Sequence, residues 1–69
     1  MWNKIDNKEI VLKIKPGNII TDSPGDSSDQ YEIKKIGIGY ITALHINGII
    51  SIRIFPEKEL MSGIWYVKK

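Results

Sequence analysis

Few residues in this chain are suited to acid–base or metal chemistry. His45 is the only histidine, and there is no cysteine. A catalytic histidine needs a nucleophile and an orienting carboxylate, but no acidic residue lies near His45 in the sequence. The same counts exclude zinc sites built from histidine and thiolate ligands. We therefore predict that the protein is not an enzyme, has no catalytic residue and binds no cofactor, and that His45 is a surface histidine beside a turn.

Three aspartates lie close together in a polar segment, at Asp22, Asp26 and Asp29. Their spacing of four and then three residues lacks the alternating oxygen ligands of a calcium-binding loop, so we expect no metal site. Together with Glu32 they give residues 18–32 four carboxylates and no lysine or arginine. A local charge of this kind favours the approach of a basic partner.

Basic and aromatic residues suggest a different partner. Lysine and arginine bind phosphate, and aromatic rings stack on bases. The candidates for such a surface are Lys34, Lys35 and Arg53, with Tyr31, Tyr40, Trp65 and Tyr66. The net charge of the whole chain is only +2, which is small for a nucleic-acid-binding protein. Nucleic-acid binding is therefore the alternative interpretation and not the favoured one.

Composition predicts that these residues are positioned by β-strands. Isoleucine, valine and threonine make up 19 of the 69 residues, and 15 of these are isoleucine. Such β-branched side chains favour strands. We predict a single all-β domain over residues 1–69, a small barrel of five or six short strands with one 3₁₀ or helical turn near residues 57–61. The chain is too short for two hydrophobic cores.

Alternation of apolar and polar residues places the expected strands. Residues 9–15 alternate and predict an N-terminal strand, which Pro16-Gly17 ends in a turn. Residues 22–30 are expected to form a polar loop. The longest uncharged stretch, residues 36–52, is too short and too interrupted by glycine to span a bilayer, so we expect no membrane association. No export signal is visible, and the predicted location is the cytoplasm.

A long hairpin is predicted from Ile36 to Phe55, with its turn at Asn47-Gly48. Gly37 and Gly39 are expected to bend its first strand. A three-residue loop would pair Thr42 with Ile52, which gathers one apolar face, whereas a two-residue loop would mix the faces. The three-residue loop is therefore favoured. The expected core consists of Ile10, Leu12, Ile14, Ile20, Ile38, Tyr40, Leu44, Ile50, Ile52 and Ile54.

Four segments carry a resemblance to a known fold: residues 16–20 (Pro-Gly-Asn-Ile-Ile), 36–41 (Ile-Gly-Ile-Gly-Tyr-Ile), 48–54 (Gly-Ile-Ile-Ser-Ile-Arg-Ile) and 65–67 (Trp-Tyr-Val). They resemble the first, second, third and closing strands of small SH3-like barrels. Asn18 stands where an aspartate is more usual. The acidic segment would then correspond to the long loop that follows the first strand of that fold.

This resemblance implies a role in binding other proteins. Peptide-binding SH3 domains recognise proline-rich or basic ligands through an acidic loop and aromatic grooves. We therefore predict a small, non-enzymatic binding module that acts through a protein partner, with an exposed tryptophan or tyrosine as its anchor. The identity of the partner and the oligomeric state stay open. The predicted contact residues are Asp22, Asp26, Asp29, Tyr31, Trp65 and Tyr66.

Overall fold

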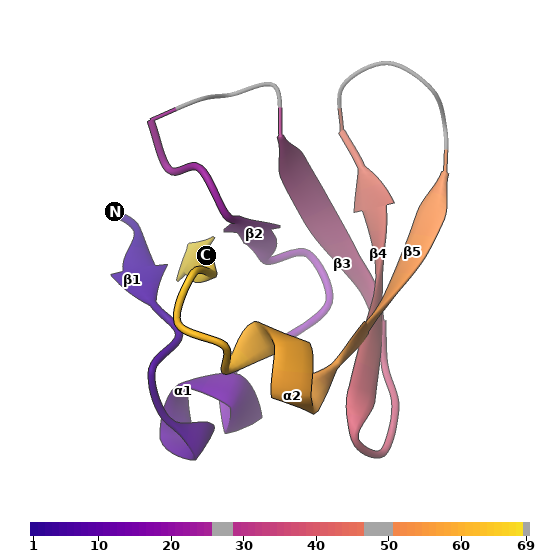
Figure 1. The fold of residues 1–69 in the computed structure, drawn as a ribbon. Helices are drawn as coiled ribbons and strands as arrows, with labels where there is room; N and C mark the ends of the chain where they lie inside the picture. The colour runs from indigo at the N-terminus through magenta and orange to yellow at the C-terminus, as the bar shows by residue number, and fades with distance from the viewer. Residues whose placement is uncertain (26–28, 47–50, 69) are drawn as a thin grey trace.

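The computed structural model describes residues 1–25, 29–46 and 51–68. In these residues six strands form one antiparallel sheet with the order β1-β6-β2-β3-β4-β5 (Figure 1). The prediction of an all-β fold with five or six strands is thus confirmed. The strands are β1 (Asn3–Lys4), β2 (Ile19–Thr21), β3 (Gln30–Ile36), β4 (Tyr40–His45), β5 (Ile52–Pro56) and β6 (Tyr66–Lys68).

Two short helices accompany the sheet, and they lie near each other in Figure 1. Helix α2 (Glu57–Leu60) follows β5 directly and confirms the helical turn predicted near residues 57–61. Helix α1 (Lys8–Leu12) lies between β1 and β2. An ion pair of 3.9 Å between Lys8 Nζ and Glu57 Oε1 links the two helices. No helix in the described part of the chain is both long enough and apolar enough to cross a membrane.

The N-terminal strand predicted for residues 9–15 is wrong, because residues 8–12 form α1. Asn7 begins this helix as its N-cap, and its side-chain oxygen accepts a hydrogen bond of 3.1 Å from the Ile10 backbone N–H. Ile10 and Ile14 are four residues apart, which also suits the inward side of a helical turn. Ile14 is buried and Ile10 is half-buried, whereas Leu12 lies largely in solvent.

The glycines at 37 and 39 make a turn between β3 and β4, so the predicted continuous strand through this region is wrong. Gly37 N–H donates to the Tyr40 carbonyl at 2.8 Å, which closes the turn. Gly39 has a φ of 78°, a left-handed conformation that glycine adopts without strain. Gly17 also has a positive φ, which agrees with the turn predicted at Pro16-Gly17.

The pairing of β4 with β5 differs from the prediction by two residues. Thr42 lies opposite Ile54 and Leu44 opposite Ile52, whereas Thr42 was expected opposite Ile52. A shift of two residues keeps the same side chains on the same face, so the predicted grouping of Tyr40, Leu44 and the two isoleucines survives. The Asn47-Gly48 turn and its loop conformation lie outside the described residues.

This grouped face points outward, and the predicted core is therefore largely wrong. Ile52 and Ile54 are 67% and 62% exposed, and Ile38, Leu12 and Tyr40 are exposed as well. Of the ten predicted residues, only Ile14 and Ile20 are buried, and Ile50 lies outside the described part. Strands β4 and β5 are apolar on both faces, so alternation alone could not tell which face is inside. The observed core consists of Ile5, Ile14, Ile20, Ile33, Ile41, Ala43, Phe55, Leu60, Trp65 and Val67.

Candidate functional site

The predicted acidic residues lie at the surface after β2 and before β3. Asp22 is exposed and accepts a hydrogen bond of 3.3 Å from the Ser23 hydroxyl. Asp29 is also exposed, and its carboxylate lies 3.8 Å from His45 Nε2. Asp26 lies outside the described residues. Thr21 ties this segment to the fold, because its buried hydroxyl donates to the Asp29 carbonyl at 2.6 Å.

The predicted aromatic anchors are less accessible than expected. Trp65 is only 2% exposed and forms part of the core, so the prediction that it offers an exposed anchor is wrong. Its large ring fills the interior between the sheet strands, where a small domain most needs apolar volume. Tyr31 and Tyr66 are half-buried, so part of each side chain can still be reached from solvent.

Tyr31 brings the predicted residues together in a cluster that we call the aromatic–arginine cluster: Tyr31, Arg53, Phe55 and Trp65. The Tyr31 ring lies edge-on to the rings of Phe55 and Trp65, with centroids 5.1 and 6.1 Å away. The Arg53 Cζ lies 4.5 Å from the Phe55 centroid and 5.7 Å from that of Trp65. The guanidinium therefore sits over an aromatic surface, where cation–π attraction holds it.

Glu59 fixes the other side of this guanidinium. Arg53 Nη2 donates to both carboxylate oxygens of Glu59, at 3.0 and 3.2 Å. Partial burial lowers the pKa of Arg53, but a hydrogen bond with Tyr31 and the charge of Glu59 outweigh this, so the pKa lies above the ordinary arginine value. Arg53 is thus a fixed positive charge.

Sequence reasoning did not connect His45, Phe55 or Glu59 with this cluster. His45 lies opposite Tyr31 in the β3–β4 pairing, and the two rings meet edge-on with centroids 5.0 Å apart. The register of β3 and β4, which places His45 opposite Tyr31, was not predicted from the sequence. Phe55 was the only phenylalanine in an isoleucine-rich chain and could have been identified as a core anchor from its size.

The buried indole of Trp65 has one unusual feature. Its Nε1–H lies in the interior and has no hydrogen-bond partner among the described residues. A buried donor without an acceptor costs about 1–3 kcal/mol. This position therefore contributes less stability than the burial of the ring alone would suggest.

The basic residues of the nucleic-acid alternative differ in whether a carboxylate pairs with them. Lys34 Nζ lies 3.3 Å from Glu32 Oε2, and Arg53 is held by Glu59. Lys35 is exposed and lies opposite Thr42 on β4. Two of the three positive charges are thus already paired with carboxylates, which weakens their attraction for phosphate.

No chemistry based on a bound metal is evident in the described ranges. Among residues 1–25, 29–46 and 51–68, no three histidine, aspartate or glutamate side chains come together as a possible metal site. His45, predicted to lie at the surface, is half-buried beside Tyr31, and the exposed Asp29 lies next to it.

A groove of about 400 Å³ lies between α1, α2 and the β3–β4 turn. Ile38 stands at its border with its side chain fully exposed, between two glycines. Leu12 and Tyr40 are exposed on the same groove. Among the described residues, the charged ones in its lining are Lys8 and Glu57, which pair with each other. We call this the hairpin groove; its apolar lining consists of Val11, Leu12, Ile14, Ile36, Ile38, Tyr40, Ile41 and Leu60.

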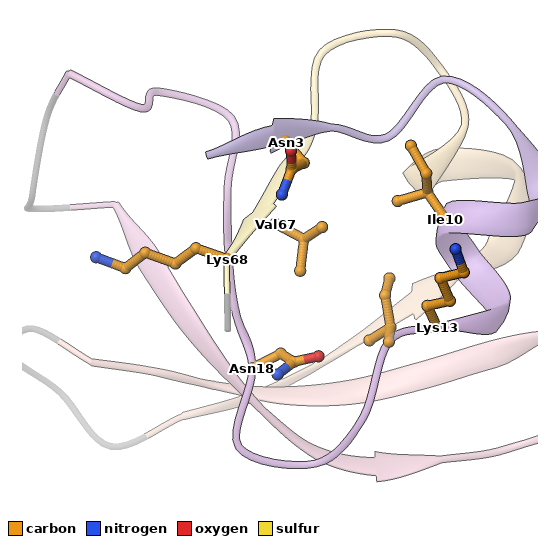
Figure 2. Close-up of a pocket in the computed structure, with 7 residues that line it drawn as sticks. Asn3, Ile10, Lys13, Asn18, Val67 and Lys68 are labelled. Carbon is orange, nitrogen blue, oxygen red and sulfur yellow. The ribbon is translucent and has the colours of Figure 1, made fainter. Parts of the chain in front are cut away.

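A second pocket, of about 300 Å³, lies between α1 and strands β1 and β6 (Figure 2). Ile10 of α1 and Lys13, the C-cap residue of this helix, line one side of it, and Asn3 and Val67 line the other. Lys68 extends away from the other labelled side chains in Figure 2, and its ammonium lies 4.7 Å from the Trp2 ring centroid. Lys68 also lines the pocket, and the Trp2 ring holds its ammonium beside it.

The geometry of the described residues thus offers a surface with an acidic border, an apolar groove and a pocket. Comparison of the chain with protein-family models, with curated proteins and with solved structures finds no match.

Proposed function

We propose that the protein is a small, non-enzymatic binding module that acts through a protein partner. The observation that carries this proposal is the hairpin groove with the fully exposed Ile38 at its border. A large apolar side chain in water costs about 1.5–3 kcal/mol relative to burial. A contiguous group of such side chains is typical of a protein interaction surface.

The position of Ile38 supports the same proposal. The tight turn holds it between Gly37 and Gly39, so that no neighbouring side chain on either side covers it. The Tyr40 ring occupies the space over Gly37, where a Cβ would overlap with Tyr40 Cζ. Glycine at 37 therefore lets the tyrosine ring fold over the turn and form one wall of the groove.

The lining of the groove indicates the partner's chemistry. Its charged residues among those described, Lys8 and Glu57, pair with each other, and the rest of the lining is apolar or glycine. A partner segment with apolar side chains would complement this surface. Nucleic acid would not, because its backbone has no apolar groups to fill the groove and because Lys34 and Arg53 already pair with carboxylates.

The acidic surface around Asp22, Asp29, Tyr31 and Tyr66 is a second proposed contact region of the same module. Asp22 and Asp29 are exposed, and Tyr31 keeps part of its ring accessible. A basic segment of a partner would be attracted here. Trp65 would act from beneath, by supporting the Tyr31 ring from the core.

Affinity capture of partner proteins by the wild-type chain and by matched variants tests which surface binds the partner. The wild-type chain, an Ile38→Asp variant and an Asp22→Ser/Asp29→Ser variant are compared, with Ile64→Asp as the control. Ile64 is also an exposed isoleucine but does not line the groove. We expect a partner that wild type and Ile64→Asp retain and that Ile38→Asp loses. Equal recovery of every partner by wild type and Ile38→Asp would contradict the role of the groove.

The same proposal extends to fold family and location. An SH3-like barrel is proposed from the motifs described above and from the antiparallel sheet. The proposed compartment is the cytoplasm, which suits a chain whose fold uses no disulfide.

A further inference from the structure

Strand β5 forms one end of the sheet. In the strand order β1-β6-β2-β3-β4-β5, the strand that pairs with it within the described residues is β4. Its other edge therefore has no strand partner in the described part of the chain. An exposed edge of this kind presents backbone donors and acceptors that another strand can join.

The pairing register shows which backbone groups this edge presents. His45 N–H donates to the Ser51 carbonyl at 3.2 Å, and these residues are opposite each other in the register of β4 and β5. Hydrogen-bonded pairs alternate along antiparallel strands, so Arg53 and Phe55 also direct their backbone groups toward β4. The N–H and C=O groups of Ile52 and Ile54 therefore point toward the outer edge.

The side chains of the same two residues are exposed. Ile52 is 67% and Ile54 is 62% exposed, and both lie on the outward face of β5, beside Leu44 and Thr42 of β4. Edge strands of monomers commonly carry lysine or proline among the residues that face outward. In β5 the proline comes only at the last position, Pro56.

We propose that a second copy of this chain pairs with this edge, β5 against β5, in an antiparallel arrangement. The sequence Ile52-Arg53-Ile54 reads the same in both directions, so a twofold axis at Arg53 pairs it with itself. Ile52 of each copy then lies opposite Ile54 of the other. The outward N–H and C=O groups of these residues form four hydrogen bonds, and four isoleucines meet on one face.

Charge on the opposite face is compatible with this pairing. The two Arg53 side chains come close to the axis, where like charges would repel. Each guanidinium is already held by both oxygens of Glu59 and lies over the Phe55 ring, so its charge is compensated within its own chain. The face that carries the arginines therefore does not prevent association.

The interface is short, so the dimer is weak. Contacts this small lie at the lower end of specific interfaces, for which we expect a Kd on the order of 100 µM. Sedimentation equilibrium from about 10 µM to about 2 mM should show the mass rising from 7.9 kDa toward twice that value. Ile54→Lys should raise the Kd at least tenfold, whereas Ile64→Lys, a control at another exposed isoleucine, should not change it. A wild-type mass of one chain at every concentration would overturn the proposal.

Amide hydrogen exchange tests the edge directly in the unaltered chain. Arg53 and Phe55 amides should be protected at every concentration, because they face β4. Ile52 and Ile54 amides should exchange quickly in dilute solution and more slowly as the concentration rises. Protection of these two amides that does not depend on concentration would contradict the pairing.

Single cysteine variants test the register, since the chain has no cysteine of its own. Opposed residues in a hydrogen-bonded pair have Cα atoms about 5.5 Å apart, within the range of a disulfide. A mixture of Ile52→Cys and Ile54→Cys chains should therefore oxidise mainly to a mixed disulfide. A yield of the mixed disulfide no higher than random pairing of the two chains gives would contradict the proposed axis at Arg53.

Discussion

The two ends of the sheet, β1 and β5, are protected from other strands to different degrees. Strand β1 has two residues, Asn3 and Lys4, both polar and exposed. Strand β5 has five residues and carries two exposed isoleucines. A short, charged edge discourages pairing, whereas a longer apolar edge favours it. The comparison indicates that this domain keeps one edge closed to partners and offers the other.

The two faces of strand β5 differ in burial: the inner face packs into the core and the outer face is exposed. Phe55 on the inner face is fully buried against Tyr31 and Trp65, while Ile54 beside it faces solvent. The strand is therefore anchored firmly by its inner face. That anchoring allows the outer face and the edge to remain exposed without loss of the fold.

The largest expected effect is a difference in the free energy of unfolding between substitutions on the inner and the outer face of β5. Phe55→Ala should lower the free energy of unfolding by about 3–5 kcal/mol, because it empties the centre of the core. A domain of this size has about that much stability in total, so the variant is expected to be mostly unfolded. Ile54→Ala should cost less than about 1 kcal/mol, since most of its side chain already lies in water. Urea denaturation of dilute samples measures both, and equal losses would contradict the assignment of the faces.

A smaller effect is expected at the ion pair beneath the β5 edge. Glu59→Gln removes the charge that compensates Arg53, and should raise the dimer Kd severalfold. The free energy of unfolding should fall by less than about 1 kcal/mol, because both side chains are partly exposed and solvent screens the pair. Glu57→Gln is the control, because Glu57 pairs with Lys8 instead. Equal dimer Kd values for both variants, measured by sedimentation, would contradict a role of Glu59 in dimer formation.

The smallest effect is expected at the opposite edge. Lys4→Ile makes β1 more apolar, yet two residues provide too few backbone groups for stable pairing. Stability should change by less than about 0.5 kcal/mol, and the Kd should stay at the wild-type value. A marked rise in association, measured by sedimentation, would show that charge and not length protects β1.

In the N-terminal segment, the sequence pattern alone could not decide between a strand and a helix. Alternation in residues 9–15 fits a strand, while the spacing of Ile10 and Ile14 fits a helical turn equally well. The hydrogen bond from Ile10 N–H to the Asn7 side chain favours the helix, and packing of Ile14 into the core completes it. Short apolar segments carry both periodicities, so the tertiary contacts made the choice.

In the candidate site, too, some features could be predicted from the sequence, whereas others depend on tertiary contacts. The exposed positions of Asp22 and Asp29 agree with their place in a polar loop. The burial of Trp65 and its contact with Tyr31 and Phe55 depend on strands far apart in the sequence. The hairpin groove likewise combines α1, α2 and the β3–β4 turn, which no local pattern relates to one another.

The sequence by itself determined the all-β class, the six-strand scale of the fold, the turns at Pro16-Gly17 and after Pro56, and the absence of disulfides. These follow from local preferences, which act over a few residues. Only the tertiary structure decided which face of β4 and β5 is buried. Both faces carry apolar side chains, and the choice depends on where Phe55, Leu60 and Trp65 can be buried together, because the large side chains exclude the most water when they share one core.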